Sequence, residues 1–173
     1  MITNIKIFKY IIPLISLVLL CGGCKVKYSF TGASISPEAK TVSIAYFPNN
    51  APLVAPILSA TLTDALQDKF VKQTRLELVK EDGDLAFEGE ITGYNSTASS
   101  ISANEYAQLN RLTITVKVKF TNKYNSKLNY TKTFSQFAEY DSNKLLQEVE
   151  STLIPEIVEK LVEDIFNAAV SNW

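Results

Sequence analysis

The chain contains no histidine among its 173 residues, and this absence excludes several common catalytic sites. Ser–His–Asp and Cys–His catalysis both need an imidazole base. Most zinc sites use histidine or several cysteines as ligands. Cysteine is nearly absent too, because Cys21 and Cys24 are the only two and both lie near the N-terminus. We therefore expect no metal site and no disulfide framework in the body of the chain.

Long apolar runs are also missing from the sequence. The main apolar stretch covers residues 10–20, whereas a membrane-spanning helix needs roughly 20 residues. Two lysines precede this stretch, and Gly22-Gly23 follow it directly before Cys24. A positive start, a short apolar stretch and small residues at the cleavage point are the three zones of a secretory signal. We therefore expect a lipoprotein signal peptide over residues 1–23 and lipidation of Cys24.

The lipid on Cys24 is expected to be a diacylglycerol on the sulfur together with an acyl group on the nitrogen. Two or more acyl chains anchor a protein stably, because each buried methylene contributes about 0.8 kcal/mol. Residues 25–27 include no acidic sorting signal, which favours a periplasm-facing position at the outer membrane. The alternative is a signal peptide cut elsewhere that leaves Cys24 unmodified. Cys21 stands where lipoprotein cleavage motifs usually have leucine.

The charge of the chain is nearly balanced. It has 17 basic and 18 acidic residues, and loss of Lys6 and Lys9 with the signal leaves 15 basic residues and a net charge of −3. Nucleic-acid-binding domains carry a basic excess, so nucleic acid is not an expected partner. We expect residues 24–38, rich in Ser, Thr, Gly and Pro, to form a lipidated tether, and residues 39–173 to form one domain.

Alternation of apolar and polar residues predicts several strands. The clearest pattern covers residues 112–120, where apolar residues alternate with Thr and Lys at a period of two. In residues 85–94, Gly89 and Gly93 share the side of the apolar residues, which indicates close packing or a bulge. Residues 95–110 are polar and are either a long loop or a weakly paired extension of the strands. Strands are expected over residues 41–47, 75–80, 85–94, 112–120 and 130–137.

Two segments have helical periodicity. Apolar residues recur every four positions between Pro56 and Gln73, which predicts a helix with one buried face. A second apolar stripe follows Asp141 or Ser142, either of which can cap a helix that ends near Ser171. Pro155 lies inside this second segment and predicts a kink or a restart, because proline lacks the backbone donor.

The order of the elements predicts the fold class. The residues Glu81-Asp82-Gly83-Asp84 contain an Asp-Gly pair of the kind that favours hairpins, so we expect a hairpin between the strands on either side. A strand, a helix, further strands and a final helix are typical of an α+β fold. We expect a two-layer sandwich with two helices packed on one face of a four- to five-stranded, mostly antiparallel sheet.

Five segments behind Cys24 match a known family in their order and spacing: Tyr28–Gly32, Val42–Asn50, Phe87–Tyr94, Arg111–Val118 and Glu163–Asn167. With these segments the chain resembles the LptE family of lipopolysaccharide-assembly outer-membrane lipoproteins in its Bacteroidetes-type form. The resemblance covers nearly all of the mature chain. It implies a two-helix, four-stranded sandwich and a non-enzymatic role. LptE-like proteins plug the LptD β-barrel, help it assemble and bind lipopolysaccharide.

Four basic residues are candidates for lipopolysaccharide binding. Arg111, Lys117 and Lys119 lie on or beside the polar face of the strand over residues 112–120, and Lys132 lies on the neighbouring strand. Lysine and arginine are natural partners of the phosphates of the lipid. The alternative is that these side chains are solvated or protect a sheet edge.

Contacts with the barrel are expected from the tether and from the polar segment after residue 94. A polar barrel lumen favours hydrogen-bonding surfaces, so Tyr28, Phe30, Ser99 and Ser100 are candidates. A plain loop is the alternative for the two serines.

Two other functions remain open from the sequence. The chain would instead be a stand-alone periplasm-facing lipoprotein that binds a glycan or lipid, or an enzyme that uses carboxylates. Glu88, Glu90 and Asp141 are the carboxylates available for such an enzyme, although Glu88 and Glu90 also suit a solvated strand face.

Overall fold

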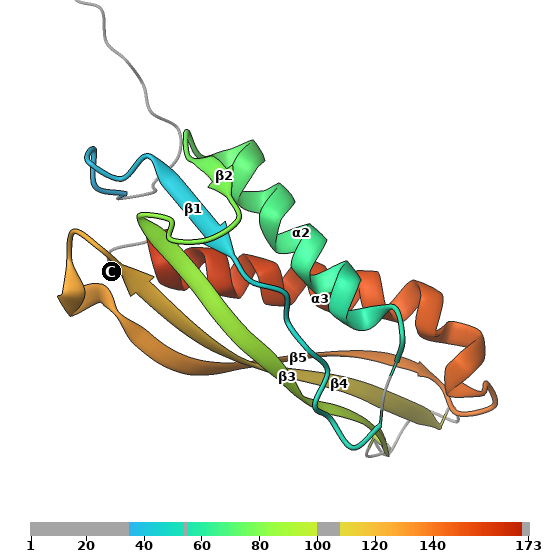
Figure 1. Ribbon diagram of the computed structural model, residues 1–173. Coiled ribbons are helices and arrows are strands. Elements are labelled where there is room, and N and C mark those ends of the chain that lie inside the picture. Colours follow the sequence, from blue (N-terminus) through green and yellow to red (C-terminus); the bar gives the residue numbers. More distant parts are fainter. Residues whose placement is uncertain (1–34, 54, 100–107, 171–173) are drawn as a thin grey trace, which may run out of the picture. The chain divides into compact units, whose positions relative to one another are not determined.

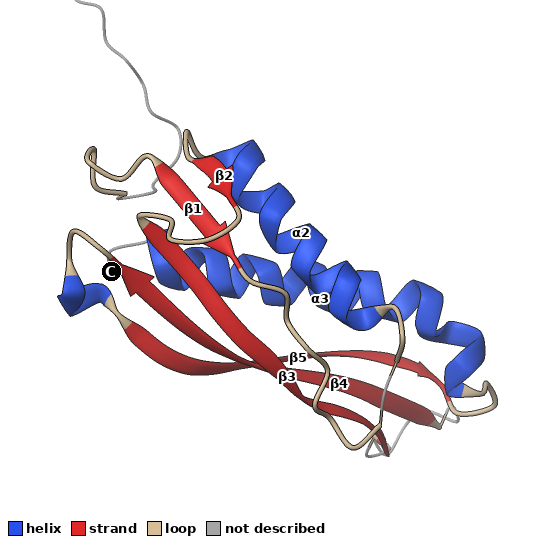
Figure 2. Cartoon of the chain, in the orientation of Figure 1, coloured by secondary structure: helices blue, strands red, loops and turns tan. Residues whose placement is uncertain are grey.

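A computed structural model describes residues 35–53, 55–99 and 108–170 (Figure 1). Its five strands form one sheet in the order β2-β1-β3-β4-β5, and both helices cover the same face of this sheet (Figure 2). The predicted two-layer α+β fold is confirmed. Within the described ranges, no helix is long and apolar enough to cross a membrane. The elements are β1 (Thr41–Ile44), α2 (Leu58–Gln73), β2 (Glu77–Val79), β3 (Leu85–Ala98), β4 (Leu109–Asn122), the short 3-10 helix η2 (Ser126–Leu128), β5 (Tyr130–Asp141) and α3 (Leu146–Val170).

The sheet is mixed rather than mostly antiparallel. Strand β1 runs parallel to both β2 and β3, whereas β3, β4 and β5 pair antiparallel. Helix α2 connects β1 to β2, as is usual for neighbouring parallel strands. The parallel part of the sheet is short, because β1 pairs with each neighbour over only a few residues.

The core lies between the sheet and the two helices. The predicted apolar faces are confirmed: Leu112 and every second residue up to Phe120 on β4 are at most 1% exposed, and so are the apolar residues at every fourth position of α2. Among the described residues, every member of the buried core cluster lies between Ala39 and Val170. The α2 residues are Leu58, Leu62, Leu66 and Phe70.

A row of aromatic rings joins the two layers. The ring of Phe70 on α2 lies 5.0 Å from Phe166 on α3 and 4.8 Å from Phe87 on β3, measured between centroids. Phe87 contacts Phe120 at 4.8 Å, and Phe120 contacts Tyr130 at 5.2 Å. Tilted aromatic pairs at such distances contribute about 0.5–1.5 kcal/mol each beyond the area they bury. The row therefore links both helices to three strands.

The connection between β2 and β3 is not the hairpin that the sequence predicts. Strands β2 and β3 lie on opposite sides of β1, and residues 80–84, here called the crossover loop, pass over β1 to connect them (Figure 1). The Asp-Gly pair therefore correctly predicts a turn, but the prediction that the strands on either side of it pair with each other is wrong. Asp82 has a positive φ of 55°, which aspartate tolerates better than most residues.

Gly83 is the residue of the crossover loop that lies closest to β1. A Cβ atom at this position would be 2.4 Å from the backbone nitrogen of Ser43 and 2.8 Å from the carbonyl carbon of Val42. The Gly83 N–H donates to Ser43 Oγ at 3.1 Å, and the Asp84 N–H donates to Thr41 Oγ1 at 2.9 Å. The loop can thus cross β1 only because glycine lets the two backbones approach.

The two glycines of β3 have different partners. Gly89 makes room for the ring of Phe47, because a Cβ atom there would be 2.5 Å from a ring carbon. A register shift between Ile91 and Gly93 marks a bulge. Beyond this bulge Tyr94 is buried and Gly93 pairs with Thr115. Gly93 therefore lies on the side opposite the apolar residues, contrary to the prediction. The predicted bulge is confirmed, and it changes which residues face the core.

The remaining differences concern the ends of elements. Strand β3 extends to Ala98 and β4 begins at Leu109, which confirms the extension of the strands over these positions. Helix α3 begins at Leu146, so neither Asp141 nor Ser142 caps it. The Asp141 carboxylate instead accepts the Asn143 N–H at 2.9 Å. The helix is continuous through Pro155, so the predicted restart does not occur.

We predict that Gly83→Ala destabilises the domain by about 1–3 kcal/mol, because the new methyl group forces the crossover loop away from β1. The free energy of unfolding, measured by urea titration, tests this. Asp82→Asn in the same loop is the control and should change it by less than about 0.5 kcal/mol, since asparagine also tolerates a positive φ. Equal stability of Gly83→Ala and the unchanged protein would contradict the close approach.

Candidate functional site

The sheet face opposite the helices, here called the open face, is the main candidate site. Residues that pair directly across antiparallel strands share a face, so the register assigns each side chain to one side. On β4, the buried residues point to the helices and the alternate residues point to the open face, where they are exposed or half-buried. The open face carries Ala86, Glu88, Glu90, Asn95, Thr97, Arg111, Thr113, Thr115, Lys117, Lys119, Thr121, Thr131, Thr133, Ser135, Phe137 and Glu139.

Hydroxyl groups dominate the centre of the open face. Thr113 and Thr115 on β4 lie beside Ser135 on β5, and the hydroxyls of Thr115 and Ser135 share a hydrogen bond of 3.1 Å. Thr131 and Thr133 continue the row along β5. Hydroxyl groups both donate and accept hydrogen bonds, so this surface can pair with many polar partners.

Arg111 lies in a cluster at one end of the open face. Its Nε and Nη2 donate to Glu139 Oε1 at 3.2 and 2.7 Å, and its guanidinium lies 4.1 Å from the ring centroid of Phe137. Ser99 Oγ donates to the same carboxylate oxygen at 2.9 Å. The hydrogen bond from Arg111, followed by that from Ser99, lowers the pKa of Glu139 below its usual value. The cluster holds the guanidinium in a fixed orientation over an exposed aromatic ring.

Lys117 and Lys119 lie further along the same face. Lys119 Nζ donates to Glu88 Oε2 on β3 at 2.9 Å. Lys117 is opposite Glu90, but the Glu90 carboxylate accepts from Asn50 Nδ2 at 2.8 Å. Among the described residues Lys117 forms no ion pair, so its ammonium group is the most available of the cations on this face.

Lys132 does not lie with the other three basic candidates. It pairs with Val118, whose side chain points to the helices, so the two residues share the helix-covered side of the sheet. Its Nζ lies 4.9 Å from the ring centroid of Tyr130. Of the four predicted residues, the structure therefore brings Arg111, Lys117 and Lys119 to one face and Lys132 to the other.

Ser99 is the one predicted barrel contact within the described residues, and it lies beside the Arg111 cluster. Tyr28, Phe30 and Ser100 lie outside the described residues, and so does Cys24. Phe137, Glu139 and the hydroxyl row on β5 are open-face residues that the sequence prediction missed. Alternation along residues 130–137 was the signal that could have found most of them.

The carboxylates considered for catalysis each have a hydrogen-bond partner. Glu88 binds Lys119, Glu90 binds Asn50, and Asp141 accepts a backbone N–H. No group of three or more metal-ligating side chains occurs in the part of the chain that the structure describes. These contacts account for the three carboxylates as parts of the folded surface.

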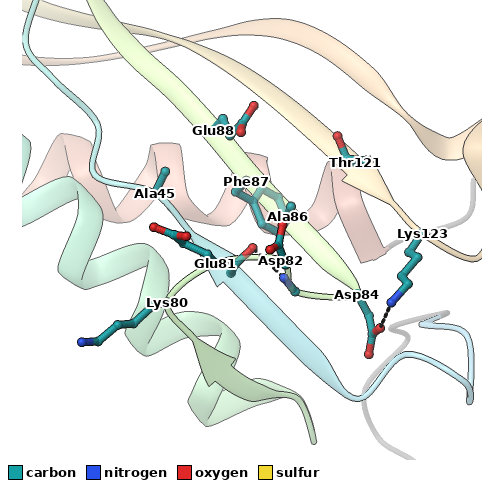
Figure 3. Close-up of a pocket in the computed structure, with 12 residues that line it drawn as sticks. Ala45, Lys80, Glu81, Asp82, Asp84, Ala86, Phe87, Glu88, Thr121 and Lys123 are labelled. Carbon is teal, nitrogen blue, oxygen red and sulfur yellow. Dashed lines mark hydrogen bonds and ion pairs between the residues drawn. The ribbon is translucent and has the colours of Figure 1, made fainter.

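A cavity of about 730 Å³ adjoins the crossover loop (Figure 3). Its lining includes Glu81, Asp82 and Lys123, together with Glu88 of the open face. Asp84 closes one side: its carboxylate accepts the backbone N–H groups of Lys40 at 2.9 Å and Thr41 at 3.1 Å, with Lys123 Nζ 3.7 Å away. The Lys40 hydrogen bond, with further contributions from Thr41 and Lys123, lowers the pKa of Asp84 to about 2. Asp84 thus anchors the loop to the start of β1.

The fold defines a two-layer α+β domain whose sheet presents a broad polar face on the side opposite the two described helices. The model of the LptE family of lipopolysaccharide-assembly proteins matches residues 39–169. The chain belongs to the LptE family. Family membership confirms the resemblance found in the sequence and gives the chain a role in lipopolysaccharide assembly among outer-membrane lipoproteins.

Several solved structures are similar to this chain at low sequence identity. The hypothetical protein CT253 from Chlamydia trachomatis aligns with a TM-score of 0.52 and 10% identity over 78% of this chain and 99% of that chain. The rare lipoprotein B from Shewanella oneidensis aligns with a TM-score of 0.48 and 11% identity over 75% and 92%. A minor lipoprotein from Acinetobacter baumannii gives 0.46 and 15% over 70% and 91%. No curated protein matches the sequence.

We predict that acid weakens the fold partly through Asp84. Because its pKa in the folded state lies below the ordinary value of 3.8, the ionised carboxylate stabilises the fold above that value. This contribution is lost as the pH falls from about 4 towards 2. Asp84→Asn should lower stability at neutral pH and flatten the pH dependence in this window. Urea unfolding between pH 6 and pH 2 measures both effects, and an unchanged pH profile for Asp84→Asn would contradict the anchor role.

Proposed function

We propose that this protein is a non-enzymatic plug and assembly partner of an LptD-type β-barrel, and that it helps insert lipopolysaccharide into the outer membrane. The observation that carries the proposal is the open face, a polar sheet surface that neither of the two described helices covers, in a chain of the LptE family. We propose further that a lipid on Cys24 anchors the protein at the periplasmic side of that membrane and that no other cofactor is needed.

The chemistry of the open face suits the lumen of a barrel. Lumen walls are polar, so a plug surface must satisfy their hydrogen-bond donors and acceptors. The hydroxyl row on β4 and β5 supplies both donors and acceptors. Arg111 and Lys119 are already paired with carboxylates of the same face, so they require little charge compensation from a partner.

Lipopolysaccharide contact is a second part of the proposal. Arg111, Lys117 and Lys119 are the candidate residues for the phosphates of the lipid, as cations of one face. Lys117 is the strongest candidate because no ion pair occupies it among the described residues. Lys132 lies on the other side of the sheet, so we do not include it with these three.

We predict that a large β-barrel protein co-purifies with this protein from solubilised outer membranes. Thr115→Trp combined with Ser135→Trp should reduce the recovered barrel strongly, because two indoles replace the hydrogen-bonded pair at the centre of the open face. The control is Asp64→Trp, which places the same side chain on an exposed position of α2.

Three results distinguish the alternatives to this proposal. Equal loss of the barrel with the control variant would remove the open face as the contact surface. Unchanged recovery with both variants would do the same. A protein recovered free of any barrel would contradict the plug role and favour a stand-alone lipoprotein that binds a glycan or lipid.

We also predict that Lys117→Glu with Lys119→Glu weakens lipopolysaccharide binding by about tenfold or more, since a hydrogen bond to a charged group contributes about 1.5–3 kcal/mol. Binding of purified protein to immobilised lipopolysaccharide at two salt concentrations measures this. Lys132→Glu is the matched control, because it reverses the same charge on the opposite side of the sheet. If the double variant binds as tightly as the control, the lysines are ordinary solvated charges.

A further inference from the structure

The free edge of β5 has backbone groups that no described residue pairs. Strand β5 is outermost over its full length, Tyr130–Asp141, whereas the opposite edge of the sheet is the short β2. The pairing of β4 with β5 has no register shift, and β5 contains no proline. Natural sheets often protect a long edge with bulges, proline or charged side chains. Between Thr131 and Ser135 the one such residue is Lys132, whose Nζ lies 4.9 Å from the Tyr130 ring centroid. This edge is therefore a template for another strand.

The register shows which residues of β5 point outward. On β4, the carbonyls of Thr115 and Leu109 are directed at β3, since they accept from Thr92 Oγ1 and the Ser99 N–H. The odd-numbered residues of β4 thus bond to β3 and the even-numbered ones to β5. It follows that the even-numbered residues of β5 bond to β4, and that Thr131, Thr133 and Ser135 present their backbone N–H and C=O groups to the free edge.

Helix α3 closes the edge at one end. Lys160 Nζ donates to the backbone carbonyl of Phe137 at 3.4 Å. The outward carbonyl of Phe137, the next outward residue after Ser135, therefore already has a hydrogen-bond donor. Next to it, Gln136 Nε2 donates to Asp164 Oδ2 at 2.6 Å. No hydrogen bond from a described residue reaches the backbone of the outward residues from Thr131 to Ser135. The open stretch is therefore centred on Thr133.

We propose that a second copy of this chain adds its own β5 to this edge, antiparallel, with the two-fold axis at Thr133. This axis is the one that uses all three free outward residues: Thr133 pairs with its symmetry mate, and Thr131 pairs with Ser135 in both directions. An axis at Ser135 would instead pair Thr133 with Phe137, whose carbonyl Lys160 already holds. A two-fold contact of this kind is self-complementary by symmetry.

The side chains of the open stretch are compatible with this pairing. With the axis at Thr133, Lys132 lies opposite Phe134 of the second copy, and both are on the helix-covered side of the sheet. A lysine ammonium over an aromatic ring is attractive, and no like charges meet. On the open face, the hydroxyls of Thr131 and Ser135 meet, which extends the hydroxyl row across both copies. A strand from another protein is the alternative occupant.

Sedimentation of residues 25–173 at increasing concentration tests the pairing, since this part contains every core residue that the structure describes and no cysteine. We expect a reversible dimer. Ser135→Pro should raise its dissociation constant roughly tenfold or more, because two symmetric hydrogen bonds are lost. Proline is tolerated here because the N–H faces outward on an edge strand. Ser135→Ala is the control, and thermal unfolding checks that both variants fold.

Cysteine cross-linking tests the register. Thr133→Cys should form an intermolecular disulfide on mild oxidation, since paired Cα atoms lie about 5.5 Å apart. Thr131→Cys should not, because two such residues would be about 13 Å apart along the strands. A protein that stays monomeric at every concentration overturns the proposal, and so does equal cross-linking of the two variants. Neither assay contains a barrel or lipopolysaccharide, so failure here leaves the proposed plug role untouched.

Discussion

The organisation of this domain depends on a sheet that is buried on one face only. Strand β4 sets this condition, because its apolar residues from Leu112 to Phe120 are buried while the alternate residues are polar. The two helices cover the apolar side, and the aromatic row from Phe166 to Tyr130 joins them to the strands. The other side is the polar open face, to which we assign the proposed contacts. Because the core lies on the opposite side of the sheet, surface residues on the open face can change without loss of the core.

A different set of contacts holds the parallel end of the sheet. Strand β1 is short, and the crossover loop fixes it by passing over its backbone at Gly83. Side chains and backbone groups bind in both directions there, since Asp84 accepts from β1 and the hydroxyls of Thr41 and Ser43 accept from the loop. A few polar contacts therefore replace the long ladder that β1 lacks. The same contacts position the cavity beside the open face.

Periodicity alone was sufficient for the helices, the long strands and the two-layer fold, because burial of one face leaves a regular pattern in α2, β4 and α3. It was not sufficient for the crossover loop. An Asp-Gly turn has the same local sequence whether the two strands that it connects pair with each other or lie on opposite sides of another strand, as β2 and β3 do. The candidate site shows the same limit. Arg111, Lys117 and Lys119 are odd-numbered residues of one strand, so their position on one face could be predicted from the sequence. The side on which Lys132 lies could not, because it depends on the register of β5 against β4. The ion pairs to Glu139 and Glu88 also depend on that long-range register.

The bulge in β3 between Ile91 and Gly93 divides that strand into two frames. Before it, odd-numbered residues face the core; after it, Tyr94 takes this place and odd-numbered residues such as Asn95 face outward. From Gly93 onward, the alternation of inward and outward residues along β3 is therefore shifted by one residue. Loss of the extra residue at the bulge, Thr92, would restore regular alternation and leave Tyr94 inward and Asn95 outward, with their partners on β4 unchanged. Loss of a single residue elsewhere in β3 would instead turn the residues beyond it to the opposite face, whereas removal of two residues from the far end of the pair would leave both faces intact. Length variation of one residue among related chains should accordingly occur at the bulge, and variation of two residues at the tip of this pair.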